Sequence, residues 1–424
     1  MNIFKQASQD YCDYATYVNS QRALPFHLDG FKPIQRRLLF CGFKDAACSR
    51  SFVKSASVCG ITIARYHPHG EQSAYGTLVN MVRAPHGVFE GHGNFGTETI
   101  PAAAMRYTEV KLSQIGKELY LRLVEEAPYF ENDLGTLEPT YTPTPIPYAL
   151  LAGAFGIGVG TSTQIPQFDL KSLIKYVRWL LSPTPRAPSV KLAYPGATFD
   201  SAIISKGTGS IRYEPVLSRE VDDDGRDVIV ISAAPPGLNV AEKVHAIFKS
   251  EIASDQVFVR DESTKTMRVV VGRGYKVRAI SDAQMEKRIR TRLTRNVTAK
   301  MVWATTRGVR LMGLREVLEK ALKAYEKAHK SHTGKQIAVL EDELKLYTVA
   351  EDFAKYMMNN KKEMEIRNAL SLTKSQFSAF SRRSLAALRD YKNNIGIRDV
   401  QKSLKSYKAM TVQDRIDETV KALP

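Results

Sequence analysis

Apolar residues recur at helical spacing through most of the first 130 positions, with short polar breaks between the segments. The run 34–40 has this spacing and follows Pro33, a residue that suits the first turn of a helix. Further helices are predicted over about 51–61 and over 71–82. Successive short helices with basic residues at their ends fit a winged-helix or helix-turn-helix DNA-binding domain, although the spacing alone does not single it out.

Between about 140 and 310 the pattern changes to short strand-like runs broken by Gly, Pro and Asp. Strands are predicted over 211–217, 227–232 and 269–271, and Asp222-Asp-Asp-Gly225 is typical of a hairpin turn. This part of the chain is therefore predicted to be an α+β domain.

From Leu311 the pattern is helical again, with an apolar stripe over 314–325 that resumes over 337–347 after an interruption at 332–334. A helical knot over 370–391 includes Phe377, Phe380, Leu385 and Leu388, and a last helical pattern fills about 396–424. Two long helices around a small globule predict an antiparallel coiled coil with a knob at its end. The predicted domains are residues 1–135, 136–310 and 311–424, with the globule at about 366–395.

The chain has 424 residues and a net charge of +17, which favours a polyanionic partner such as nucleic acid. Residues 265–310 hold thirteen Lys and Arg against two acids, Asp282 and Glu286, and so carry +11 of that charge. We expect a phosphate-binding surface there, because so few acids are interleaved; a solvated helix face is the alternative.

Four cysteines, Cys12, Cys41, Cys48 and Cys59, form no Cys-x-x-Cys pair and are expected to be reduced thiols. No signal peptide opens the chain, and no apolar run approaches the roughly 20 residues of a membrane span. We therefore expect a cytoplasmic protein without a membrane partner.

Tyr107 is the main candidate for chemistry, in the run Pro101-Ala-Ala-Ala-Met-Arg-Tyr-Thr-Glu109. A phenol has a pKa of about 10 and is a poor nucleophile at neutral pH. A neighbouring guanidinium, here Arg106, stabilises both the phenolate and an anionic transition state. Taken alone, this run more often marks a half-buried tyrosine whose hydroxyl meets water.

Several further motifs stand in a set order: Arg22-Ala-Leu-Pro25, Asp29-Gly-Phe-Lys-Pro-Ile-Gln-Arg-Arg-Leu-Leu39, Tyr66-His-Pro-His-Gly-Glu-Gln-Ser73, Gly91-His-Gly-Asn-Phe-Gly96 and Ala102-Ala-Ala-Met-Arg-Tyr-Thr-Glu109. Together they resemble the breakage-reunion subunit of type IIA DNA topoisomerases over essentially the whole chain. That family includes the A subunits of gyrase and topoisomerase IV, and the medium subunit of the T4-type phage enzyme, to which this chain is closest in character. The resemblance implies an α+β multidomain fold: a winged-helix DNA-gate domain, an α/β tower domain, and a long antiparallel coiled coil with a small helical C-gate.

The resemblance also implies roles for individual residues. Tyr107 would attack a DNA phosphodiester and form a 5′-phosphotyrosyl bond, and Arg106 would stabilise the charge of the pentavalent phosphate. His69 would bind phosphate oxygens or shuttle the tyrosine proton. DNA contacts would come from a further set: Arg22, Lys32, Arg36, Arg37, His67 and Ile157. From the residues alone, His67-Pro-His69 is more often a rigid loop that caps the next helix, and two histidines do not indicate zinc.

The glycine-rich run Phe155-Gly-Ile-Gly-Val-Gly160 first suggests a phosphate loop, but it lacks the Lys-Ser/Thr ending. By resemblance it is a DNA-bending loop, in which Ile157 wedges between base pairs and the glycines let the backbone approach the minor groove. A buried isoleucine in a tight loop is the alternative.

The resemblance implies an ATP-dependent type II topoisomerase that acts as a homodimer on double-stranded DNA. Nothing in the sequence resembles an acidic Toprim site or an ATP-binding fold, and Asp222–Asp224 lie in a predicted turn. Mg²⁺ and ATP would therefore be bound by a partner ATPase/Toprim subunit. The Gly70-Glu-Gln-Ser73 form suggests a phage-encoded enzyme in a bacterial host's cytoplasm. Because no repeat-containing β-domain follows the predicted coiled coil, we expect relaxation and decatenation rather than active supercoiling.

Two other functions fit the same scaffold. A non-catalytic, DNA-bending architectural protein would bind DNA without covalent capture. A topoisomerase-like nuclease subunit would share the tyrosine chemistry, but the Arg22–Arg37 motif and the long predicted coiled coil argue against it.

Overall fold

A computed structural model describes residues 3–46, 48–97, 100–263, 266–274, 280–359, 361–382 and 396–421. It divides into two compact units, Met1–Tyr325 with Thr419–Pro424, and Glu326–Glu418. Both helices and small sheets are present, so the predicted mixture of α and β structure is confirmed. None of the helices in the described ranges combines the length and the apolar character that crossing a bilayer requires.

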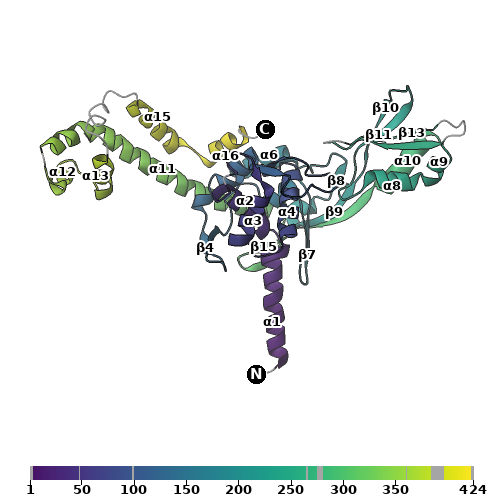
Figure 1. Ribbon diagram of the computed structural model, residues 1–424, viewed down its shortest axis with the longest axis horizontal. Helices are drawn as coiled ribbons and strands as arrows, with labels where there is room; N and C mark the ends of the chain where they lie inside the picture. The colour runs from purple at the N-terminus through teal and green to yellow at the C-terminus, as the bar shows by residue number, and fades with distance from the viewer. Residues whose placement is uncertain are drawn as a thin grey trace. The chain divides into compact units, whose positions relative to one another are not determined.

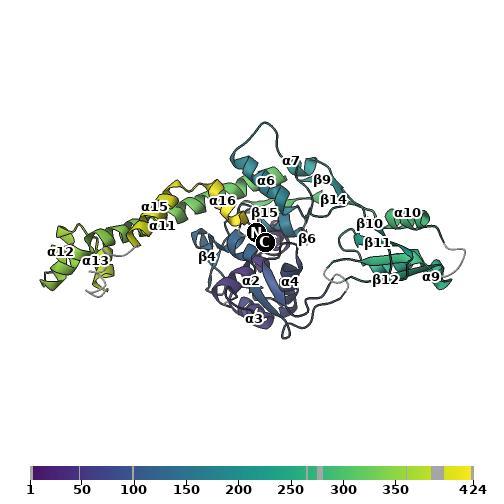
Figure 2. The same cartoon turned by 90° about the horizontal axis from the view of Figure 1, so that it is seen from above.

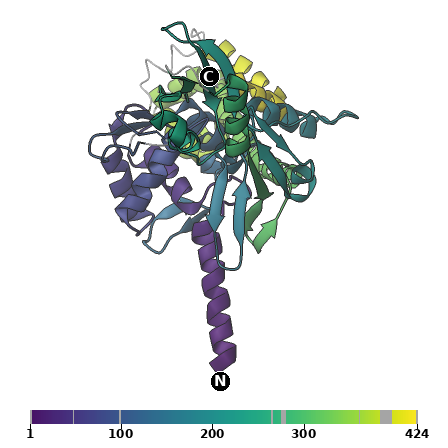
Figure 3. The ribbon, with the colours of Figure 1, turned by 90° about the vertical axis from the view of Figure 1, so that its right-hand side faces the viewer.

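The first unit begins with an exposed helix, α1 (Ile3–Val18), which runs directly into one π-helical turn, η1 (Asn19–Ala23). α1 stands away from the rest of this unit (Figure 1; Figure 3), and it carries three largely exposed tyrosines: Tyr11, Tyr14 and Tyr17. In η1 the environment changes, because Asn19 and Ala23 are each only 6% exposed. The π turn therefore brings the free helix into contact with the folded body.

Three helices and a small antiparallel sheet follow: α2 (Pro33–Lys44), α3 (Ser55–Arg65), α4 (Glu71–Arg83), β1 (Val53–Lys54), β2 (Phe89–His92) and β3 (Glu109–Leu112), in strand order β1-β3-β2. α2 and α4 begin where the sequence predicts. The helix predicted over 51–61 instead begins at Ser55, because Val53 pairs with Val110 in the sheet.

Short elements then build an aromatic core: η2 (Gly116–Leu121), η3 (Val124–Glu126), β4 (Tyr129–Glu131), β5 (Leu137–Pro139) and α5 (Tyr148–Ala152). Phe31 stacks on Tyr148 with ring centroids 4.7 Å apart, and Tyr120 meets Phe31 edge-on at 5.0 Å. This core fixes the segment before α2 against α5.

A five-stranded sheet has the order β6-β7-β14-β9-β8, and its strands β9 and β14 lie side by side in Figure 2. Its strands are β6 (Ala154–Ile157), β7 (Ser162–Ile165), β8 (Ala197–Phe199), β9 (Thr208–Tyr213) and β14 (Arg295–Lys300), and α6 (Leu170–Leu181) and α7 (Ala202–Lys206) lie between β7 and β9 in the chain. The strand predicted over 211–217 is divided between β9 and the next strand, since Pro215 lacks the N–H that a continuous ladder needs.

A four-stranded antiparallel sheet has the order β10-β11-β13-β12. Its elements are β10 (Val216–Val221), β11 (Asp227–Ala233), β12 (Val257–Asp261), β13 (Val269–Arg273), α8 (Val240–Ile247), α9 (Lys249–Ala253) and α10 (Asp282–Leu293). One face of the sheet packs with α8 and α10 in a shared apolar core that includes Val244, Met285 and Ile289 (Figure 1). Asp222–Gly225 form the β10–β11 turn, as predicted.

The hairpin β15 (Val302–Thr305) and β16 (Gly308–Leu311) lies against the segment that follows η1. Phe26 bridges to Ala304, and His27 N donates to Ala304 O at 3.0 Å. Trp303 is fully buried. These contacts give η1 a rigid support on the side of its C-terminal end.

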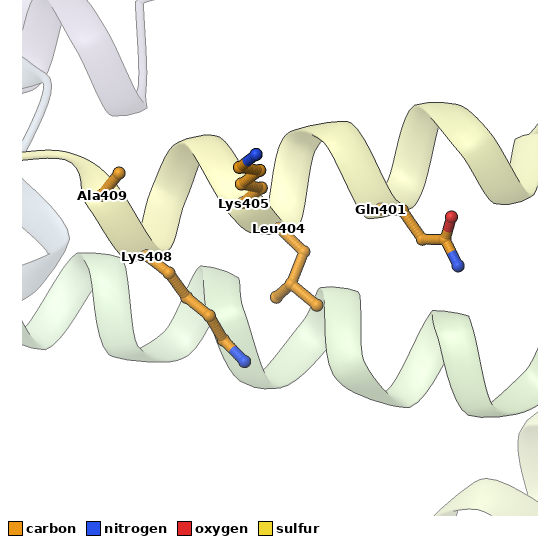
Figure 4. A pocket seen from close by; sticks show the side chains of 5 residues that line it. All are labelled: Gln401, Leu404, Lys405, Lys408 and Ala409. Carbon is orange, nitrogen blue, oxygen red and sulfur yellow. The ribbon is translucent and has the colours of Figure 1, made fainter.

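The second unit contains most of α11 (Leu314–Met358), a continuous helix of 45 residues, so the predicted interruption at 332–334 does not break it. The unit also contains α12 (Glu363–Ala369), α13 (Lys374–Ser381), α15 (Gly396–Ala409) and the start of α16 (Val412–Lys421). Phe353, Ile366 and Leu372 form its core. Figure 4 shows α15 along α11, where Lys408 pairs with Glu341 at 2.6 Å. Leu385 and Leu388 of the predicted globule lie outside the described residues.

Candidate active site

Tyr107 lies in the loop between β2 and β3, two residues before β3 begins. Its side chain is 64% exposed, and its N–H donates to Ala104 O at 2.9 Å. The guanidinium carbon of Arg106 lies 4.6 Å from the centroid of the Tyr107 ring. The phenol is therefore presented to solvent with a cation over its ring, and the alternative of a half-buried, packed tyrosine is excluded.

The loop around Tyr107 is held by buried hydrogen bonds. Tyr75 Oη of α4 donates to Ala103 O at 2.6 Å and lies 3.0 Å from Thr108 Oγ1. Thr108, fully buried, also donates to Ser55 Oγ at 2.8 Å. These bonds fix the backbone on both sides of Tyr107 and leave its own side chain free.

His67 and His69 follow α3, and their rings stack with centroids 4.2 Å apart. Arg37 Nη1 lies 2.9 Å from His67 Nδ1. A guanidinium only donates hydrogen bonds, so Nδ1 accepts and the ring proton is on Nε2. His67 is 7% exposed, whereas His69 is exposed. The pair therefore offers one open imidazole, that of His69, to a ligand.

Burial lowers the pKa of His67 to about 4, with further lowering by the charges of His69, Arg37 and Arg22. His67 is consequently neutral at physiological pH. Arg22, an exposed arginine of η1, is the last of these charges.

Arg37 is held by a carboxylate that lies in none of the sequence motifs. Its Nε and Nη2 donate to Glu138, with Nη2 to Oε1 at 2.7 Å and Nε to Oε2 at 2.9 Å. Glu138 is 3% exposed. Arg37 thus bridges a buried glutamate and His67 and presents little of its guanidinium to solvent.

Arg36, also predicted to bind DNA, faces the interior. Its Nε donates to Asp29 Oδ2 at 2.6 Å and its Nη2 to Oδ1 at 3.0 Å. Asp29 is fully buried and accepts the N–H groups of Phe31 and Thr142 as well. The pair ties the start of α2 to the segment before α5.

Ile157 lies at the end of β6, at the tip of the β6–β7 hairpin, and is 73% exposed, so the alternative of a buried isoleucine is excluded. Lys32 Nζ donates to Phe155 O of the same hairpin at 2.7 Å. Burial lowers the pKa of Lys32. The ammonium group therefore supports the hairpin through its backbone.

Two groups of predicted DNA-binding residues are joined by contacts. Arg37, His67 and His69 lie together, and Lys32 lies with the hairpin that carries Ile157. Among the described residues of one chain, no hydrogen bond, ion pair or ring contact joins Tyr107 or Arg106 to either group. The nucleophile and the histidine pair are therefore separate features of the single chain.

The basic segment 265–310 is less uniformly cationic than its sequence indicates. Several of its arginines pair with acids, mostly from other parts of the chain: Arg268, Arg273, Arg288, Arg290 and Arg310. Others are exposed and form no ion pair with any described acid: Lys287, Arg292, Arg295, Lys300 and Arg307. The small number of interleaved acids therefore does not give the charge around this segment, because the fold brings in Glu220, Glu251, Glu262 and Glu316.

The acidic residues form ion pairs rather than a metal site. Within the described ranges, no three His, Cys, Asp or Glu residues converge as a metal site. Asp222 is engaged by Arg226 and Arg260, both at 3.2 Å. Glu109, the carboxylate nearest Tyr107 in the sequence, pairs with Lys54 at 2.9 Å and His92 at 3.1 Å. All four cysteines are free thiols, as predicted.

Comparison with known proteins places these features in one family. The family described as DNA gyrase/topoisomerase IV, A subunit, matches residues 22–423. The chain is 30% identical to the A subunit of DNA topoisomerase 4 from Staphylococcus epidermidis over 394 residues, covering 84% of this chain and 48% of that protein. It is 34% identical to the A subunit of DNA gyrase from Klebsiella oxytoca over 295 residues, covering 64% and 34%. It therefore spans half or less of these relatives' length, and it belongs to the family of DNA gyrase and topoisomerase IV A subunits.

Proposed function

We propose that the chain is the DNA-cleaving and religating subunit of an ATP-dependent type II DNA topoisomerase. The observation that carries the proposal is the exposed Tyr107 with the Arg106 guanidinium over its ring, on a rigidly held loop within the family match. The phenolic oxygen attacks a backbone phosphorus, a P–O(Tyr) bond forms, and the P–O3′ bond breaks. The 5′ end stays on Tyr107, and the same step in reverse religates the strand.

The other site residues divide into groups that contact DNA and groups that position them. Arg106 stabilises the developing phosphate charge, and Arg22 and His69 are exposed and free to meet phosphate oxygens. His69 also receives the tyrosine proton or passes it to the leaving 3′ oxygen. Because Lys32, Arg36, Arg37 and His67 are committed to protein partners, we assign them positioning roles. Ile157 is the wedge that bends the DNA.

The order of the elements supports this assignment. We infer that α2, α3, α4 and the β1-β3-β2 sheet are the winged-helix DNA gate, and that the two larger sheets form the tower. The helices α11 and α15 would form the coiled coil, with α12 and α13 in the C-gate. One tyrosine cuts one strand, so a double-strand gate needs two copies of the chain.

Mg²⁺ and ATP are assigned to a partner subunit with ATPase and Toprim domains. Glu109, the carboxylate nearest Tyr107 in the sequence, is already paired with Lys54. Among the described residues of this chain, no three His, Cys, Asp or Glu side chains converge as a metal site. When bound by the partner, the metal would supply charge to the reacting phosphate.

Strand passage through the gate would relax and decatenate DNA. A DNA substrate and the bacterial relatives favour the cytoplasm of a bacterial host, and the Gly70-Glu-Gln-Ser73 form favours a phage-encoded enzyme.

The deciding experiment uses Tyr107→Phe in the complex with the partner subunit, on supercoiled plasmid. The variant should relax no DNA, and denaturing the wild-type reaction should trap breaks with protein on their 5′ ends. Tyr14→Phe, on exposed α1, is the matched control and should behave as wild type. Relaxation by Tyr107→Phe, or wild-type reactions without protein-linked breaks, would show that the catalytic assignment is wrong.

A further inference from the structure

The hairpin that carries Ile157 is fastened near its tip by a single side chain from a distant part of the sequence. Asn19 Nδ2 donates to Val159 O at 3.0 Å, and Val159 N donates to Asn19 Oδ1 at 2.9 Å. Asn19 therefore pairs with the Val159 backbone as a neighbouring strand would, although it lies in η1. It is 6% exposed, so both bonds are shielded from water.

Elsewhere the hairpin is attached at its base. β7 joins the five-stranded sheet through one pair, Gln164 with Lys300, and Thr163 Oγ1 donates to Lys300 O and accepts from Val302 N, both at 3.2 Å. Lys32 Nζ holds Phe155 O on β6. An isolated two-stranded hairpin is marginally stable in water. Among the described residues, Asn19 is the side chain whose hydrogen bonds hold the loop beyond Ile157 to the rest of the fold.

Two glycines allow this close approach. A Cβ on Gly158 would overlap the amide of Asn19, and a Cβ on Gly156 would overlap the carbonyl of Ala23. Neither glycine has a positive φ, so the backbone conformation itself would accept alanine. The glycines predicted to admit DNA are thus needed for contact with the protein's own π turn.

The same turn carries Arg22, whose charge acts on His67. Single π-helical turns are rare and frequently mark functional sites. η1 consequently carries both Asn19, which holds the hairpin, and Arg22, two positions three residues apart. A displacement of the hairpin would be passed to η1 at this point.

We propose that Asn19 is a positioning residue that locks the DNA-bending hairpin to η1, so that Ile157 can hold a bend. The proposal rests on the proposed function, in which Ile157 is the wedge. A wedge bends DNA only if the protein segment that carries it is stiffer than the duplex. Asn19 supplies that stiffness without touching DNA.

The first test compares Asn19→Ala, Ile157→Ala and wild type in the complete enzyme with its partner subunit. DNA bending is measured by energy transfer between the ends of a short duplex, and cleavage by trapped covalent complex. Asn19→Ala should bend less and trap about tenfold less complex, with nearly unchanged DNA affinity. A duplex with a short single-strand gap at the wedge position should restore cleavage, because it bends without help. The control is Asn368→Ala, an exposed asparagine of α12 in the second unit.

The second test uses the overlap between Gly158 and Asn19. Gly158→Ala should reduce cleavage in the wild-type background, since the new methyl group displaces the hairpin. In the Asn19→Ala background the obstructing amide is gone, and the nearest remaining atom is Ala23 Cβ at 3.5 Å. The double variant should then cleave no less than Asn19→Ala alone, a strong departure from additivity.

The outcomes separate this proposal from the proposed function. If Ile157→Ala bends and cleaves as wild type, the wedge assignment itself is wrong. If Ile157→Ala bends and cleaves DNA less than wild type but Asn19→Ala does not, the positioning role of Asn19 is wrong and the wedge role of Ile157 remains. The positioning role of Asn19 is also overturned if Asn19→Ala lowers the melting temperature and stays inactive on the gapped duplex. It is overturned as well if the effects of the substitutions at 19 and 158 on cleavage are additive.

Discussion

At Arg37 one guanidinium connects a buried carboxylate to an imidazole. Glu138 accepts hydrogen bonds from Nε and Nη2 of Arg37. Nη1 of Arg37 donates to His67 Nδ1, so the ring proton of His67 is on Nε2. Removing a charged partner from a buried hydrogen bond costs more than removing a neutral one. Through Arg37, Glu138 thus determines which ring nitrogen of His67 carries the proton, and the ring of His67 stacks on that of His69.

Glu138→Gln should therefore lower DNA cleavage about tenfold through loss of a charged hydrogen bond. DNA affinity should stay equal or increase, because one negative charge near the phosphates is removed. Trapped covalent complex and a binding titration measure the two effects, and Glu131→Gln on exposed β4 is the control. Cleavage that rises together with affinity would contradict a positioning role.

The lowered pKa of His67 predicts a pH dependence of stability. An unfolded histidine gains a proton as the pH falls below about 6.5, whereas folded His67 stays neutral until about pH 4. The unfolded state binds more protons in this window, so stability is full above pH 6.5 and falls towards pH 4, by on the order of 3 kcal/mol. Denaturant unfolding of wild type, His67→Gln and the exposed control His245→Gln between pH 7 and 4 measures this. His67→Gln should lose less stability than the other two.

At the level of elements, the β6–β7 hairpin carries one exposed isoleucine, Ile157, and one buried isoleucine, Ile165. Ile157→Ala should leave the free energy of unfolding almost unchanged, since its side chain is 73% exposed, but should reduce bending and cleavage. Ile165→Ala, on the same hairpin and 3% exposed, should lower the free energy of unfolding by about 2 to 5 kcal/mol. Denaturant titrations of both variants check the contrast. A large stability loss in Ile157→Ala would return that residue to a structural role.

Elements with local signals could be predicted from the sequence, and those set by distant pairing could not. Pro33 and the Lys32–Gln35 cap define the start of α2, and the Asp222 turn defines a hairpin. The shift of α3 to Ser55 follows from strand pairing of Val53 with Val110, which no local pattern reveals.

The candidate site divides in the same way. Tyr107, Arg106, His67 and His69 could be named as candidates because they stand in short motifs that resemble those of a known family. Glu138 and Asn19 act on partners 101 and 140 positions away, through hydrogen bonds that no spacing in the sequence indicates. Arg36 and Lys32 have the residue types that usually contact DNA phosphates. Only the structure shows that Arg36 binds Asp29 and that Lys32 binds the carbonyl of Phe155.

For the molecule as a whole, the net charge overstates how many cations are free to contact DNA. Half of the described cations of segment 265–310 are already paired with acids of the protein, and exposed pairs of this kind add little to stability. The set that remains for phosphate is Lys287, Arg292, Arg295, Lys300 and Arg307.

Replacing that free set by glutamine should lower the salt dependence of DNA binding, by about 0.9 in the logarithmic slope for each phosphate that is no longer neutralised. The paired set, Arg268, Arg273, Arg288, Arg290 and Arg310, is the matched control. Its replacement should change the slope less, because those cations already have counter-charges in the protein. Binding titrations at several salt concentrations give both slopes. Equal slopes for the two variants would show that pairing does not decide which cations meet DNA.

The overlap between Gly158 and Asn19 also has an evolutionary consequence. A mutation that adds a side chain at 158 is harmful while asparagine occupies 19, and becomes acceptable once 19 has changed. The order in which such changes accumulate is therefore constrained, and the two positions should covary among relatives. Asparagine at the first position should occur with glycine at the second, and lineages with a bulkier residue at the second should have lost the asparagine.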